Sequence, residues 1–243
     1  AAITKMGMVF RNETGTQEFK DNDCKDFIFN VGTFQLTLNA PATSTTVLNS
    51  GQSYTISATT SLSANFSLRA NGNLIDQKTN LTNYNYTHTT TQDTNFVLEA
   101  NNNGEIKSVS FNFVVKPTVT EAAVPSGMKD GINLNPSDNT KATLVFYAPM
   151  KDFVHVIGDF NNWTRNDSYL LKKDSSKDRF WIELTGLNPQ TNHTYQYLVD
   201  ATIKVADPYS TVILDESNDQ YINATTYPNL PAYPPGKTNH AVT

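Results

Sequence analysis

The chain has 243 residues, a formal net charge of −5 at pH 7 and 17% charged residues. Because its Lys and Arg residues are scattered, this mild acidity argues against nucleic acid and anionic membranes as partners. No apolar run is long enough to span a membrane, and abundant Thr, Asn and Ser favour β structure with many turns. We expect an all-β protein of tandem immunoglobulin-like sandwiches, with a partial hairpin at its N-terminal end.

Residues 1–36 predict two or three strands with a turn. The stretch GMVFRNETGT at 7–16 resembles the last hairpin of a family 26 starch-binding sandwich, and residues 26–31 would be its closing strand. The resemblance implies that residues 1–36 are the terminal strands of a preceding module that binds starch.

Residues 37–116 show the alternating apolar pattern of a β-sandwich. Seven strands are expected, which is typical of an immunoglobulin-like domain. Asn71-Gly72 and Asn103-Gly104 predict hairpin turns. Because this stretch contains no Trp and no acid pair in a plausible cleft, we interpret it as a spacer.

Residues 117–129 contain two prolines and a glycine between small residues and are predicted to be a linker. Further strands are expected at 142–148, 153–158, 180–185 and 194–200. Proline blocks ladder hydrogen bonds, so the proline-rich residues 227–243 are predicted to be an extended linker toward a catalytic domain that is absent here.

The stretch GDFNNWT, Gly158–Thr164, is the most informative part of the chain because it follows a predicted strand and places Trp163 in a short loop. Indole is costly to leave in water. Two interpretations remain open. Trp163 folds back and plugs one end of a small sandwich, or it forms a flat platform for a sugar ring.

The residues downstream extend this motif. They are FW at 180–181, GL at 186–187, YQYLVD at 195–200 and DPYS at 207–210. Their order resembles carbohydrate-binding module family 48, the isoamylase N-terminal domain, and is similar to the glycogen-binding domain of the AMP-activated protein kinase β subunit. The resemblance covers residues 130–226. The run DPYSTVILDESNDQYI at 207–222, followed by YPNLPAYPPGKT at 227–238, resembles the segment that leads into the catalytic barrel of bacterial α-amylases of glycoside hydrolase family 13.

The resemblance implies a sugar site. In those relatives a Trp of the FNNW loop stacks on glucose, and a Lys, a second Trp and an Asn complete the site. It assigns the loop residues Asn161, Asn162 and Trp163 to carbohydrate binding, with Gln196 at the Lys position and Asn218 at the Asn position. Ile203 stands near the second Trp position, so only one aromatic remains. Trp181 alternates with core residues and is interpreted as structural.

The sequence shows no pattern typical of catalytic residues. A retaining glycosidase needs two carboxylates about 5 Å apart in a cleft, whereas the acids here stand in turns and at strand ends, where Asp favours turns. The four histidines lack zinc-binding spacing, and His155 is expected to be structural. Cys24 is the single cysteine and is expected to be inert. We therefore predict no catalytic residue, no metal and no cofactor.

Together these features predict a non-catalytic region that binds and positions α-1,4-glucan in an α-amylase-like glycoside hydrolase, with the parent's catalytic barrel as its other partner. The alternative is a scaffold that docks on that barrel without binding glucan. A third interpretation, an independent hydrolase, is opposed by the missing acid pair.

The expected location follows from the Asn-x-Ser/Thr sequons and the single cysteine. Eight sequons occur, and a glycan at Asn162 would obstruct the proposed site. We therefore expect an unglycosylated bacterial protein that is secreted or held at the cell surface. It is expected to be a monomer, and no signal peptide is visible in this stretch.

Overall fold

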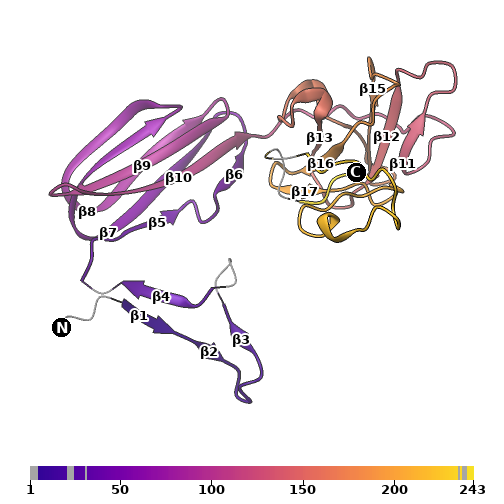
Figure 1. Cartoon of the computed structure of the whole chain (residues 1–243). Helices are drawn as coiled ribbons and strands as arrows, with labels where there is room; N and C mark the ends of the chain where they lie inside the picture. The colour runs from indigo at the N-terminus through magenta and orange to yellow at the C-terminus, as the bar shows by residue number, and fades with distance from the viewer. Residues whose placement is uncertain (1–4, 21–24, 31, 235, 237–239) are drawn as a thin grey trace. The chain divides into compact units, whose positions relative to one another are not determined.

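The computed structural model describes residues 5–20, 25–30, 32–234, 236 and 240–243. Within them the chain is all-β, as the composition predicted, with three short 3₁₀ turns and no α-helix. It divides into two compact units, Ala1–Val115 and Lys116–Thr243, which are described separately (Figure 1). Three residues with earlier predictions lie outside the described residues. They are Cys24, predicted to be an inert thiol, Val31, predicted to end a strand, and Pro235, predicted to lie in the C-terminal tail.

The first strands of the chain form the expected hairpin. The ring of Phe10 meets that of Phe27 edge-on, with centroids 5.5 Å apart. Membership of a preceding module stays a prediction. The strands are β1 (Lys5–Met8), which pairs with β4 (Phe27–Asn30), and β2 (Phe10–Arg11), which pairs with β3 (Glu18–Phe19), both antiparallel.

An immunoglobulin-like sandwich follows. It has six strands rather than seven, and one of them runs without a break from Gln52 to Ala70. That stretch contains no Gly or Pro to break it, and shifts of register absorb the bend. The strands are β5 (Leu36–Ala40), β6 (Thr45–Leu48), β7 (Gln52–Ala70), β8 (Asn73–Thr90), β9 (Thr94–Asn102) and β10 (Glu105–Val115).

Both predicted hairpin turns of this sandwich are confirmed. Asn71 and Gly72 join β7 to β8 with φ of 49° and 82°, and Asn103 and Gly104 join β9 to β10 with φ of 49° and 98°. Two successive positive φ angles suit a type I′ turn, which matches the twist of paired strands. The alternating apolar residues then fall on one face and form the core, from Phe34 onward.

The second unit is also a sandwich, with two sheets packed over one core. Four of its strands were predicted, whereas the short strands β11, β14 and β17 were not. One sheet has the order β11 (Gly131–Leu134), β12 (Ala142–Tyr147), β15 (Arg179–Leu184), β14 (Lys172–Asp174), and the other has β13 (Val154–Gly158), β16 (Tyr195–Val199), β17 (Ile203–Val205). The 3₁₀ turns are η1 (Asp159–Asn161), η2 (Asp167–Tyr169) and η3 (Asp219–Tyr221).

The predicted linker 117–129 is not free of this sandwich. Lys173 N donates to Thr120 O, and Ala122 N donates to Lys173 O, each at 2.9 Å, so this segment runs along the edge strand β14. The indole nitrogen of Trp181 donates to Ala122 O at 2.9 Å, which fits the structural role predicted for that Trp. The segment covers a sheet edge that would otherwise be open.

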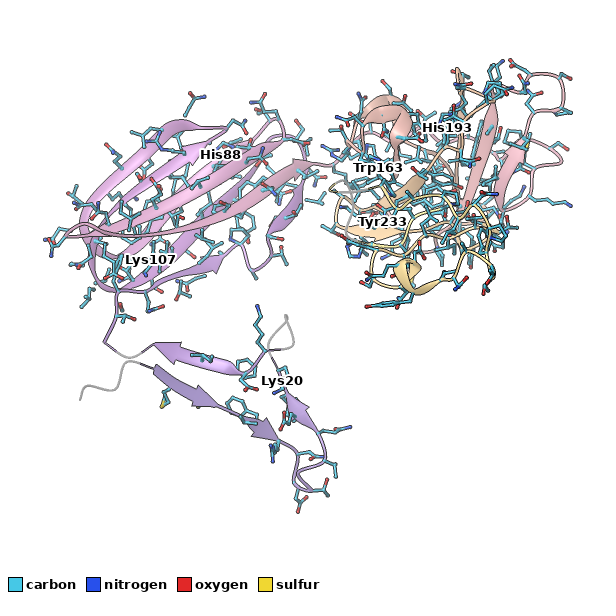
Figure 2. The ribbon with its side chains drawn as sticks, viewed as in Figure 1. Lys20, His88, Lys107, Trp163, His193 and Tyr233 are labelled. Atoms are coloured by element: carbon cyan, nitrogen blue, oxygen red, sulfur yellow. The ribbon has the colours of Figure 1, made fainter. Side chains whose placement is uncertain are left out.

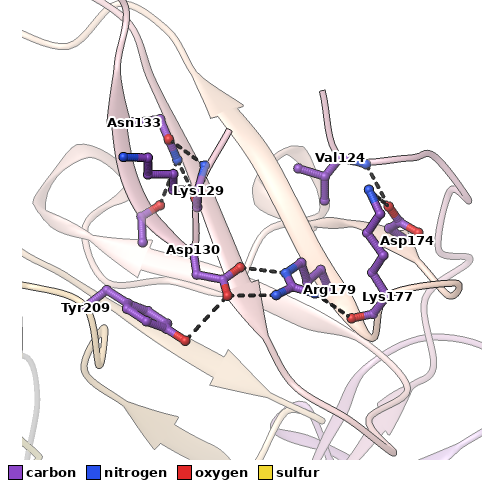
Figure 3. A network of polar contacts seen from close by, with 9 residues as sticks. Val124, Lys129, Asp130, Asn133, Asp174, Lys177, Arg179 and Tyr209 are labelled. Atoms are coloured by element: carbon purple, nitrogen blue, oxygen red, sulfur yellow. Dashed lines mark hydrogen bonds and ion pairs between the residues drawn. The ribbon is translucent and has the colours of Figure 1, made fainter. Parts of the chain in front are cut away.

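An ion pair joins β15 to the start of the sandwich. The guanidinium of Arg179 donates to both carboxylate oxygens of Asp130, at 2.6 and 2.9 Å (Figure 3). Tyr209 OH donates to the same carboxylate at 3.4 Å. These hydrogen bonds, chiefly those from Arg179, hold the pKa of Asp130 below its usual range.

This lowered pKa predicts acid sensitivity. The Asp130 carboxylate stabilises the fold above its unfolded-state pKa, and this stabilisation is lost as pH falls through the lower folded-state pKa. We expect Asp130→Asn to lower the melting temperature at pH 7 and to reduce the further loss between about pH 5 and pH 2. Thermal unfolding followed by circular dichroism checks this, with Asp178→Asn in an exposed turn as the control. Equal acid-induced losses in the Asp130 variant and the parent would contradict it.

Candidate functional site

The loop that carries Trp163 starts where β13 meets β16. Gly158, the last residue of β13, pairs with Tyr195 of β16. A Cβ at Gly158 would lie 2.5 Å from Thr194 O and 2.7 Å from the ring of Phe160. Only glycine fits this close approach, so it sets the point at which the chain leaves the sheet.

Asn161 closes the loop. Its side-chain oxygen accepts from Gly158 N, and its side-chain nitrogen donates to Val156 O, each at 2.9 Å. Trp163 N donates to Gly158 O at 2.8 Å. Both ends of the Asn161 amide are thus used inside the protein. Asn161 thus holds the shape of the loop, and its predicted contact with carbohydrate stays a prediction.

The next two residues are in the left-handed region. Asn162 has φ of 54° and Trp163 has φ of 57°. Such a backbone is uncommon for a bulky residue and costs on the order of 1 kcal/mol, so it persists only where the surroundings impose it. Among the described residues, the indole of Trp163 has no hydrogen-bond or ring partner. Asn162, the residue before it, is exposed. The position of Trp163 within the second unit can be followed in Figure 2.

The core is closed by other aromatics. Phe160 and Tyr169 pack against it and stack with centroids 5.4 Å apart, whereas Trp163 is half-buried and does not belong to the core. This arrangement disfavours the interpretation of Trp163 as a plug. The role of Trp163 as a sugar platform stays a prediction.

Gln196 requires a correction, since the resemblance predicted a sugar contact at this position. The side chain is fully buried, and its nitrogen donates to His240 O and Ala241 O, each at 2.9 Å. Thr243 exchanges two backbone hydrogen bonds of 3.0 Å with Tyr195, which holds the segment in place. The C-terminal segment predicted to be a linker therefore covers Gln196, and a ligand cannot reach it in this structure.

The remaining predicted positions lie apart. Asn218 is exposed, but its amide nitrogen donates to Asp215 at 3.0 Å within a turn. Ile203 is 46% exposed in β17 and pairs with Val199, at the end of the sheet opposite Gly158. The structure thus gathers Asn161, Asn162 and Trp163 in one loop but does not bring Ile203 beside the start of that loop.

A buried carboxylate organises the strand behind the loop. Asp207 is fully buried and accepts hydrogen bonds from Tyr195 OH at 2.8 Å and from Tyr197 OH at 3.1 Å. Tyr209 N also donates to it, at 2.9 Å. Burial raises the pKa of both tyrosines, so they stay protonated as donors.

Two histidines of the unit pair with acids. His193 Nδ1 lies 2.9 Å from Asp159, and the buried His155 Nε2 lies 3.2 Å from Asp167. Burial lowers the pKa of His155, against the opposing effect of Asp167. In the part of the chain that the structure describes, no three His, Cys, Asp or Glu residues gather as metal ligands would. In the same part, no helix has the length and apolar character needed to cross a membrane.

A groove of about 970 Å³ also opens in the second unit. Leu144, Leu184 and Leu187 line it, as do the Phe160 ring and His193. The sequence did not predict this groove, because its walls come from segments far apart in the chain and no local motif marks them.

No family model matches the chain, and no curated protein matches it. Among solved structures, fibronectin(III)-like modules of Clostridium thermocellum CbhA are 19% identical, covering 33% of this chain and 95% of the modules, with a TM-score of 0.29. Klebsiella pneumoniae pullulanase complexed with maltotriose is 16% identical, covering 50% of this chain and 12% of the pullulanase, with a TM-score of 0.27. Bacteroides uniformis β-glucuronidase 3 is 8% identical, covering 72% of this chain and 25% of the enzyme, with a TM-score of 0.29.

This chain therefore corresponds to a small part of either glycosidase. The neighbours are β-sandwich modules or large enzymes that include glycoside hydrolases. At TM-scores below 0.5, these likenesses support no statement about activity or ligand.

The burial of Gln196 predicts the effect of restoring the Lys that the resemblance expects there. Gln196→Lys would place an ammonium group in a fully buried position, so we expect the free energy of unfolding to fall by about 2 kcal/mol. Gln196→Met is the control. It removes the two hydrogen bonds and also the buried oxygen that has no partner, so it should lose less.

Urea unfolding followed by fluorescence compares the two variants. If Gln196→Lys is as stable as the parent, the C-terminal segment can be displaced at little cost and the side chain of residue 196 can face solvent.

Proposed function

We propose that the second unit, Lys116–Thr243, binds α-1,4-glucan without hydrolysing it and that Trp163 is the platform on which a glucose ring stacks. The observation that carries this proposal is the indole itself, held outside the core on a left-handed backbone by a loop that Asn161 closes. Its flat face suits the C–H face of a sugar. The exposed amide of Asn162 can donate to and accept from hydroxyls.

In its wider context, we propose a binding and positioning region of a secreted bacterial α-amylase-like glycoside hydrolase. The GDFNNWT order and the DPYS segment support this context. The first sandwich acts as a spacer, and the protein is a monomer whose partners are the glucan and the parent's catalytic barrel.

The hydrogen bonds of the acids support a non-catalytic role. Asp207 accepts from two tyrosines, and Asp200 accepts from Asp152 N at 3.0 Å and Phe153 N at 3.1 Å. Asp174 accepts from Val124 N at 3.0 Å. Each of these carboxylates holds a turn or a strand end. A glycosidase would instead direct two acids into a cleft.

We therefore expect the purified chain to release no reducing sugar from soluble starch above a heat-denatured control. The measurement is a reducing-end assay over many hours at neutral and mildly acidic pH. Release that depends on enzyme concentration and survives repurification would overturn the non-catalytic assignment.

A scaffold without glucan affinity is the second candidate, and a specific observation favours it. Gln196 is covered and Ile203 is aliphatic, so two of the contacts that the resemblance expects are missing. Under this alternative the second unit docks on a catalytic domain, and Trp163 contributes to that contact.

Substitution of Trp163 separates the two candidates. One stacked ring with few hydroxyl partners should give a Kd near the millimolar range for maltoheptaose, about −4 kcal/mol. Trp163→Ala should remove most of this binding with little change in melting temperature, because the indole lies outside the core. Titration calorimetry in the low-affinity regime measures it.

Tyr221→Ala, which truncates an aromatic side chain that is 80% exposed, is the control. Unchanged affinity in the Trp163 variant would exclude the platform. Absence of binding in the parent would leave the scaffold as the function.

A further inference from the structure

The groove of the second unit has a lining unlike that of the Trp163 loop. Its volume of about 970 Å³ is in the range of ligand sites in proteins. Its floor is apolar, with Leu144 and Leu184 from β12 and β15, and Tyr227 stands at its wall with 41% of its surface exposed. Trp163 is not among the lining residues, although Phe160 of the same loop is.

The walls of the groove carry uncharged polar groups that are free to bind. Within the described part of the chain, five of these side chains make no hydrogen bond, and each can both donate and accept. They are Thr191, Thr211, Asn139, Asn192 and Asn229.

The charged groups of the groove are already paired. Lys141 lies 3.4 Å from Asp138, and His193 lies 2.9 Å from Asp159. No Asp, Glu or Arg is found among the described residues that line it. An ionic ligand would find no unpaired opposite charge, and a purely apolar chain would leave the wall amides desolvated without partners.

We propose that this groove is a second binding site for a neutral oligosaccharide, an α-1,4-glucan segment. Such a chain presents apolar C–H faces to a leucine floor and an aromatic ring, and hydroxyls to amides and hydroxyls at the walls. The site shares its ligand class with the proposed platform at Trp163 but does not depend on that residue. It would let one sandwich hold a glucan at two places.

The test is a titration of the isotope-labelled full chain with maltoheptaose, followed by amide chemical shifts. In Trp163→Ala, the amides of residues 187–194 should still shift, with a Kd in the millimolar range. Adding Asn192→Ala and Tyr227→Ala should weaken this remaining binding at least about fivefold. Tyr221→Ala in the same background is the control and should change nothing. Melting curves of each variant, and the single Asn192→Ala variant, show whether weaker binding comes from loss of folding.

The outcomes distinguish the two sites. If Trp163→Ala abolishes every shift, the groove is not a site and the platform stands. If, in the parent protein, the amide signals of the groove shift and those of the Trp163 loop do not, the groove is a binding site and the Trp163 platform is not. If Trp163→Ala still binds maltoheptaose and the groove substitutions do not change its affinity, the groove is not a binding site.

Discussion

The hydrogen bonds to one buried carboxylate hold the second unit together. Asp207 lies in the segment after the second sheet, and it can stay buried because Tyr195, Tyr197 and a backbone amide donate to it. Its own backbone N–H donates to the hydroxyl of Thr243 at 2.7 Å. The central strand, the segment after it and the C-terminal residues are thus fixed to one another. Loss of the carboxylate would leave two buried hydroxyls without an acceptor.

Both the loop and the covered face follow from this arrangement. Because Tyr195 is fixed, Gly158 beside it leaves the sheet at a defined point, and Asn161 closes the loop over that point. Because Thr243 is fixed, the residues just before it pass over Gln196. The same constraint therefore sets the loop that carries Trp163 and buries Gln196, which is why both the platform and the scaffold are proposed for this fold.

Features set by neighbouring residues could be predicted from the sequence, and features set by distant contacts could not. The Asn-Gly turns and the GDFNNWT loop depend on local backbone preference, and both lie where they were predicted. The short strands β11, β14 and β17 are too brief to show a period, and they exist because neighbours pair with them. Likewise, the cover over Gln196 and the walls of the groove come from segments that approach only after folding.

We propose that Trp163 faces a ligand, whereas Trp181 does not. The protein has these two indoles alone, and that of Trp181 donates to Ala122 O at 2.9 Å. The indole N–H resonances of the two residues can be followed in a maltoheptaose titration. We expect the Trp163 proton to exchange quickly with solvent and its signal to shift as the sugar is added. The Trp181 proton should be protected from exchange, and its signal should not shift. A Trp163 proton that is protected from exchange, with a signal that does not shift on addition of maltoheptaose, would exclude Trp163 as the sugar platform.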